Sequence, residues 1–140
     1  MVQHVVTSLA TPKVILYIVA EGRLLLFRRP GAPNQGLQVP GGSVEPHESL
    51  EHAAVREATE ETGLRVLRLE AFLGTAHYVT RDPPGALHLR HFFHLSCPRA
   101  QPARWRHVEA QGAPFELFWE PLETARPDWE MDAYLAALRS

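Results

Sequence analysis

The chain has little cysteine and no long hydrophobic run. Cys97 is the single cysteine among 140 residues. One cysteine cannot form an internal disulfide or a thiolate metal cluster, so neither kind of cross-link can stabilise this chain. The longest apolar run, 14–20, is far shorter than the roughly 20 residues of a membrane helix. The first residues also lack the basic start and apolar core of a secretion signal. We therefore expect a cytoplasmic protein.

Excess charge of either sign is also missing. The formal net charge is −2 at pH 7, with a pI near 6.4. This balance gives no general attraction to polyanions, so we expect neither stable nucleic-acid binding nor membrane binding. With 45% hydrophobic residues and no internal repeats, we expect residues 1–140 to form one compact domain. Association into a homodimer is left open.

The segment 42–64 contains a dense group of acidic residues, GSVEPHESLEHAAVREATEETGL. Glu57, Glu60 and Glu61 fall within little more than one helical turn, next to Arg56. Like charges four residues apart destabilise an isolated helix by about 0.2 to 0.5 kcal/mol. A divalent cation would turn this repulsion into attraction. The spacing therefore indicates a cation site.

The apolar positions show which side of this helix carries the acids. We expect the helix to run from Ser49 to Thr62, with entry signals at Pro46 and Ser49 and a left-handed cap at Gly63. Glu57 and Glu61 share a face with the small apolar residues, whereas a solvated charge run would lie opposite them. The residues of this apolar stripe are Leu50, Ala53 and Ala54.

These residues carry a family resemblance. The segment matches the Nudix box, G-x5-E-x7-R-E-U-x-E-E-x-G-U with U aliphatic, without gaps, although Ala58 is small for an aliphatic position. The preceding residues 39–42, VPGG, are similar to the usual lead-in, with Leu37 where tryptophan is often found. The nine matching residues are Gly42, Glu48, Arg56, Glu57, Ala58, Glu60, Glu61, Gly63 and Leu64.

The resemblance implies hydrolysis of a diphosphate bond with Mg²⁺ or Mn²⁺. It implies a metal site of Glu57, Glu60, Glu61 and the carbonyl of Gly42, with Arg56 in the catalytic set. Hard oxygen ligands select such cations. Glu57 is the first candidate for the general base, and the allocation among the three acids stays open. Glu48 could be structural or could coordinate metal.

Some members of the family use another acid from a later loop. Glu109 is the first candidate for this additional metal ligand, and Glu116 is the second. Either residue could instead be an ordinary surface glutamate.

The substrate is a nucleotide-type small molecule by resemblance: a nucleoside triphosphate, dinucleoside polyphosphate, nucleotide sugar or ADP-ribose. Arg28 and Arg29, at the end of an expected strand, are candidates for binding phosphate. Tyr78 and Trp105 are candidates for stacking on a base. A rival interpretation is a catalytically silent Nudix-fold module that senses nucleotides.

The pattern of elements predicts an α/β fold. A final helix should begin at Asp128 and present Trp129 and Met131 on its apolar face. The order resembles the Nudix α/β/α sandwich, with a mixed β-sheet between helices. The expected strands are 14–19, 23–27, 37–39, 65–75, 87–95 and 115–119.

Overall fold

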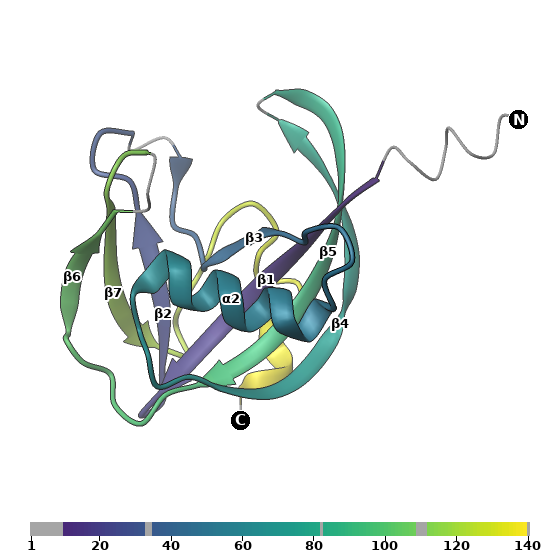
Figure 1. The fold of residues 1–140 in the computed structure, drawn as a ribbon. Coiled ribbons are helices and arrows are strands. Elements are labelled where there is room, and N and C mark those ends of the chain that lie inside the picture. The colour runs from purple at the N-terminus through teal and green to yellow at the C-terminus, as the bar shows by residue number, and fades with distance from the viewer. Residues whose placement is uncertain (1–9, 33–34, 82, 109–111, 140) are drawn as a thin grey trace, which may run out of the picture.

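The structure, a computed structural model, describes residues 10–32, 35–81, 83–108 and 112–139. Strands dominate these residues, and they form a seven-stranded sheet (Figure 1). In chain order the elements are β1 (Ala10–Ala20), β2 (Arg23–Arg28), β3 (Gly41–Ser43), α2 (Leu50–Thr62), β4 (Arg68–Arg81), β5 (Pro84–Ser96), β6 (Arg104–His107), β7 (Phe115–Pro121) and the 3₁₀ helix η2 (Leu135–Leu138).

Strand β1 is the centre of this mixed sheet. The strand order is β4-β5-β1-β2-β7-β6, and β3 pairs with β1 beside that path. β1 runs parallel to β5 but antiparallel to β2 and β3. Its side chains alternate between two buried clusters, with Leu16 in one cluster and Tyr17 in the other. The sheet is therefore buried on both faces.

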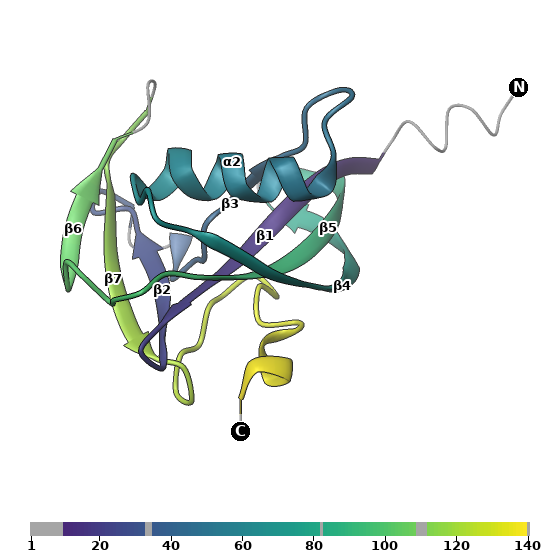
Figure 2. The same ribbon diagram turned by 60° about the horizontal axis from the view of Figure 1, so that its bottom comes forward.

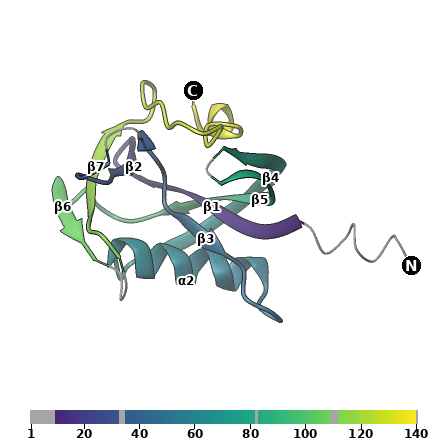
Figure 3. The same ribbon diagram turned by 90° about the horizontal axis from the view of Figure 1, so that it is seen from above.

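Each face of the sheet has its own cover. Helix α2 packs on one face through small residues, and the C-terminal segment packs on the other through Met131 and Leu135. Figures 2 and 3 show the sheet between these two layers. This arrangement confirms the expected α/β class. No helix in the described ranges is long and apolar enough to span a bilayer. The small residues of α2 are Ala53, Ala54 and Ala58.

Both ends of α2 are fixed as the sequence predicts. The Ser49 side chain accepts a hydrogen bond from the backbone N–H of His52, and Gly63 closes the helix in a left-handed conformation. Strand β6, which was not predicted, supports the last turn. The indole N–H of Trp105 donates to the carbonyl of Thr62 at 2.9 Å. This contact ties the acidic end of the helix to the edge of the sheet.

The expected α-helix after Asp128 is wrong. The chain forms turns there, and η2 begins at Leu135. Trp129 and Glu130 both have φ near 60°, which a right-handed helix does not allow. The Asp128 carboxylate accepts a hydrogen bond from the backbone N–H of Leu37 instead of capping a helix. Contacts with the sheet therefore override the local helical pattern.

The expected strand at 37–39 is reduced to one bridge, between Phe27 and Gln38. Strand β3 comes later, at Gly41–Ser43, so that the glycine pair lies within the sheet. Backbone pairing with β1 explains the shift, because glycine residues can form a ladder although they rarely favour strands.

Arg56 and Glu48 hold the start of α2 in place. The Nε of Arg56 donates to Oε2 of Glu48 at 2.7 Å, and its Nη2 donates to the Ser43 carbonyl at 3.0 Å. The Glu48 side chain is 6% exposed. The hydrogen bond from Arg56 holds the pKa of the Glu48 carboxyl well below its usual range. Glu48 therefore has a structural role.

This pairing predicts a specific loss of stability in acid. In the unfolded chain Glu48 takes up a proton at about pH 4.3. In the folded chain its carboxylate stays ionised at that pH, because its pKa is lowered. Its stabilising contribution is therefore complete above about pH 5 and is lost progressively as the pH falls below that value. We expect the free energy of unfolding to fall less steeply with decreasing pH in Glu48→Gln than in the unsubstituted protein.

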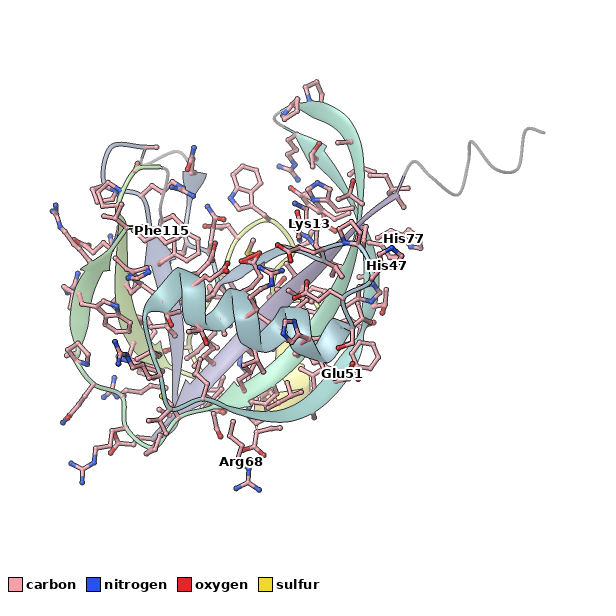
Figure 4. All side chains as sticks on the ribbon, in the orientation of Figure 1. Lys13, His47, Glu51, Arg68, His77 and Phe115 are labelled. Atoms are coloured by element: carbon pink, nitrogen blue, oxygen red, sulfur yellow. The ribbon has the colours of Figure 1, made fainter. Side chains whose placement is uncertain are left out.

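Urea unfolding at several pH values between about 3 and 6 measures this slope. Glu51→Gln is the matched control, because Glu51 is exposed on the same helix (labelled in Figure 4), and we expect it to keep the original slope. Equal slopes for Glu48→Gln and the unsubstituted protein would contradict the prediction.

Candidate active site

The carboxylate of Glu57 lies against the backbone of β3. Glu57 is buried on the side of α2 that packs on the sheet. Gly42 pairs with Val14 of β1, and a β-carbon added to Gly42 would lie 1.7 Å from Oε2 of Glu57. No residue with a side chain would allow this approach. Gly42 is thus the position that lets a buried carboxylate reach the sheet.

Glu61 reaches the same strand one helical turn later. Its Oε1 accepts a hydrogen bond from the backbone N–H of Gly41 at 3.0 Å. Glu57 and Glu61 are four residues apart on α2, so they lie one above the other. The structure therefore brings Glu57, Glu61 and Gly42 together.

Glu60 points elsewhere. Its side chain is 51% exposed, and its Oε2 forms an ion pair with Nη1 of Arg56 at 3.2 Å. The same Nη1 lies 3.7 Å from Oε2 of Glu57. Arg56 therefore lies between two of the three acids and balances their charge. Its hydrogen bond to Glu48 raises the pKa of the guanidinium further, so Arg56 is a permanent cation.

The donor atoms decide whether a divalent cation fits here. Among the described residues, no group of three His, Cys, Asp or Glu side chains is arranged to hold a metal ion. Glu57 and Glu61 nevertheless converge on one glycine pair and offer hard oxygen atoms, the type that Mg²⁺ and Mn²⁺ prefer. These donor atoms therefore fit Mg²⁺ or Mn²⁺. Glu60 would add a third carboxylate if its side chain left the ion pair with Arg56.

A cavity of about 260 Å³ opens beside the glycine pair, and Gly41, Gly42 and Glu61 form one wall. Figure 4 shows Lys13 beyond α2, on the side where β3 runs. The cations that line this cavity outnumber its one carboxylate, so it suits an anion. They are Lys13, Arg29 and Arg90.

A second cavity of about 360 Å³ adjoins the first, and Gln38, Arg90 and Met131 line both. Tyr78 and Trp129 supply aromatic surface to this second cavity. The guanidinium of Arg90 lies 3.6 Å from the centre of the Tyr78 ring and donates to the Trp129 carbonyl at 2.6 Å. Arg90 thus forms the wall between the two cavities.

His88 also lines the first cavity. Burial, reinforced by Lys13 and Arg90, lowers the pKa of the His88 imidazole. His88 is therefore neutral near pH 7 and can either donate or accept a hydrogen bond in the cavity.

Of the substrate-binding candidates, Arg29 lines the first cavity and Tyr78 lines the second. Arg28 instead forms an ion pair with Glu116 at 3.3 Å. Trp105 lines neither cavity. It packs against the core cluster beneath α2.

Of the two candidates for an additional acid, only Glu116 lies within the described residues. Glu109 lies outside the described residues. Glu116 forms ion pairs with Arg28 and Arg104, both at 3.3 Å.

Several cavity residues were not among the candidates from the sequence, among them Lys13, His88 and Trp129. Lys13 has the same parity along β1 as buried Ile15, and His88 has the same parity along β5 as Arg90, so strand alternation could have grouped them. Trp129 gives no such signal, because its position depends on a left-handed turn and on a hydrogen bond from its indole N–H to the Gln35 carbonyl.

Known proteins share parts of this sequence. An ADP-ribose pyrophosphatase of Methanocaldococcus jannaschii is 41% identical over 69 residues, which are 49% of this chain and 40% of that protein. YtkD of Bacillus subtilis, named as a candidate 8-oxo-dGTP diphosphatase, is 54% identical over 41 residues, which are 29% of this chain and 25% of that protein. The matches therefore span less than half of either relative.

The fold is shared more widely than the sequence. The NUDIX domain of Shewanella oneidensis NrtR, solved in complex with ADP ribose, matches with a TM-score of 0.67 at 18% identity and covers 93% of this chain and 86% of that chain. The profile of the NUDIX domain matches residues 10–138. With the Nudix box placed against β3 and a family match along almost its whole length, the chain belongs to the NUDIX domain family.

Proposed function

We propose that this chain hydrolyses a diphosphate bond in a nucleoside diphosphate linked to another group. The observation that carries the proposal is the convergence of Glu57 and Glu61 on Gly41 and Gly42, beside a cavity lined by cations. Cleavage of a phosphoanhydride requires charge neutralisation and alignment more than covalent catalysis. This site offers groups for both tasks.

The cations of the first cavity would hold the phosphate groups. Arg29 and Arg90 can each donate two hydrogen bonds to phosphate oxygens, and Lys13 adds a positive charge. Arg90 is 5% exposed and is held by the Trp129 carbonyl, so its guanidinium is already oriented. A diphosphate bound there would lie next to Glu61.

Nudix hydrolases generally depend on a divalent metal. In this chain Glu57, Glu60, Glu61 and the backbone of Gly42 would hold Mg²⁺ or Mn²⁺, and Glu109 is proposed as a further ligand. When bound, the metal supplies charge neutralisation for phosphate oxygens and acidifies water.

Proton transfer falls to the buried carboxylate. Glu57 is the proposed acceptor for the proton of the attacking water, because its carboxylate lies at the glycine pair. Arg56 is a positioning residue that fixes Glu57 and Glu60 through contacts of 3.7 and 3.2 Å. Because Arg56 is itself anchored by Glu48, the charge balance of the site is coupled to the start of α2.

Removing the charge of Glu61 should abolish turnover while the fold remains. We expect Glu61→Gln to lower kcat/KM by about 100-fold or more in the presence of Mg²⁺ or Mn²⁺. The assay uses a panel of nucleoside triphosphates, nucleotide sugars, dinucleoside polyphosphates and ADP-ribose, with products identified by mass.

Glu51→Gln controls for the loss of one glutamate from α2 and should retain full activity. The metal should also raise the melting temperature of the unsubstituted protein more than that of Glu61→Gln. Tight nucleotide binding without turnover across the whole panel would contradict the hydrolase and favour a sensor.

A methyl group at position 42 should separate activity from stability. In Gly42→Ala the new β-carbon would displace the Glu57 carboxylate, which is the far end of a flexible side chain. We expect a loss of about 100-fold in kcat/KM, because a displacement of about 1 Å in a catalytic group has effects of this size. The melting temperature should change far less.

Gly31→Ala is the matched control, since a β-carbon at Gly31 meets no atom within 4 Å. It should leave both the kinetics and the melting temperature unchanged. If Gly42→Ala were as active as Gly31→Ala, the close approach of Glu57 to β3 would have no role in the reaction.

A further inference from the structure

The second cavity has surfaces that a phosphate does not need. Tyr78, Trp129 and Met131 give it flat and apolar walls, and its volume of about 360 Å³ suits a small organic group. It joins the first cavity at Gln38 and Arg90. A nucleotide whose phosphates occupy the first cavity could therefore place its base in the second.

Arg81 lines this cavity next to Trp129. Its guanidinium carbon lies 5.7 Å from the centre of the Trp129 ring, and its side chain is exposed. Within the described part of the chain, Arg81 forms no ion pair. The Arg81 guanidinium has N–H donors and no acceptor, and it lies over the Trp129 ring in the lining of this cavity.

Gln35 and Gln38 also line the cavity, and their side-chain amides can both donate and accept, so they suit either purine. Two further polar side chains of the lining already have partners. The Trp129 indole N–H donates to the Gln35 carbonyl. The Thr80 hydroxyl donates to the Pro83 carbonyl and accepts from the N–H of Ala86. The described lining residues include two arginines and no carboxylate. The cavity is thus rich in donors, and its side-chain acceptors are neutral.

We propose that the second cavity selects a purine with an oxo group at C6, as in guanine or hypoxanthine, over adenine. Arginine pairs with the O6 and N7 acceptors of such a base, whereas the N6 amino group of adenine is a donor and faces a guanidinium. The apolar walls and the two glutamine amides of the cavity can accept either purine, whereas a guanidinium only donates hydrogen bonds, so the selection falls to Arg81. This inference deepens the proposed function and rests on it.

Inosine and adenosine triphosphates test the selection, because they differ mainly at position 6. We expect kcat/KM for ITP and GTP to exceed that for ATP by about tenfold or more. Arg81→Gln should bring the ITP and ATP values close together. Arg104→Gln is the matched control, since Arg104 is another exposed arginine over an aromatic ring, 5.4 Å from the centre of Phe118, and it should keep the preference.

The outcomes separate the two proposals. If ITP and ATP are cleaved equally well, or if Arg81→Gln keeps the preference, base selection is overturned while the hydrolase stands. If no nucleotide is cleaved, the hydrolase fails, and calorimetric binding of α,β-methylene analogues of GTP and ATP decides the inference. A tenfold tighter GTP analogue, with the difference lost in Arg81→Gln, supports it; equal affinity or no binding overturns it.

Discussion

The close approach between Glu57 and Gly42 is the constraint on which the site depends. Helix α2 and strand β3 are joined by a short loop, and the helix packs on the sheet through alanine residues. Small residues bring the helix near, and a glycine at position 42 leaves room for a carboxylate at the contact. A buried charge is costly unless it is balanced, and Arg56 provides the opposite charge within 3.7 Å. Packing and electrostatics therefore act on the same few residues.

The C-terminal segment packs on the opposite face of the sheet and lines the second cavity. The C-terminal segment is held there by the Tyr17 hydroxyl, which donates to the Met131 carbonyl at 2.6 Å and accepts from the N–H of Tyr134 at 3.2 Å. This anchoring places Trp129 and Met131 at the cavities. The acidic residues come from helix α2 on one face of the sheet, whereas Trp129 and Met131 come from the C-terminal segment on the other face. Arg90, on strand β5 of the sheet, lies between them.

The sequence predicts the positions of the acidic residues on α2 better than those of the cavity residues, for physical reasons. The acids lie on one helix, so the helical period is enough to place Glu57 and Glu61 on a common face, and local signals at Ser49 and Gly63 set the boundaries. Trp129 and Arg90 meet only in the folded chain, through a contact across 39 residues. Trp105 shows the same limit: the sequence made it a candidate for stacking on a base, whereas long-range packing half-buries the ring against the core.

The most direct test of this account is where a paramagnetic divalent ion binds. With Mn²⁺ added to isotope-labelled protein, the account predicts that the amide signals of Gly41, Gly42 and residues 57–61 broaden first. It also predicts that Glu61→Gln weakens this effect, whereas an equal amount of Ca²⁺, which is not paramagnetic, produces no broadening. Broadening centred elsewhere on the molecule, or none at these residues at saturating Mn²⁺, would contradict the claim that Glu57 and Glu61 build a metal site on the glycine pair of β3.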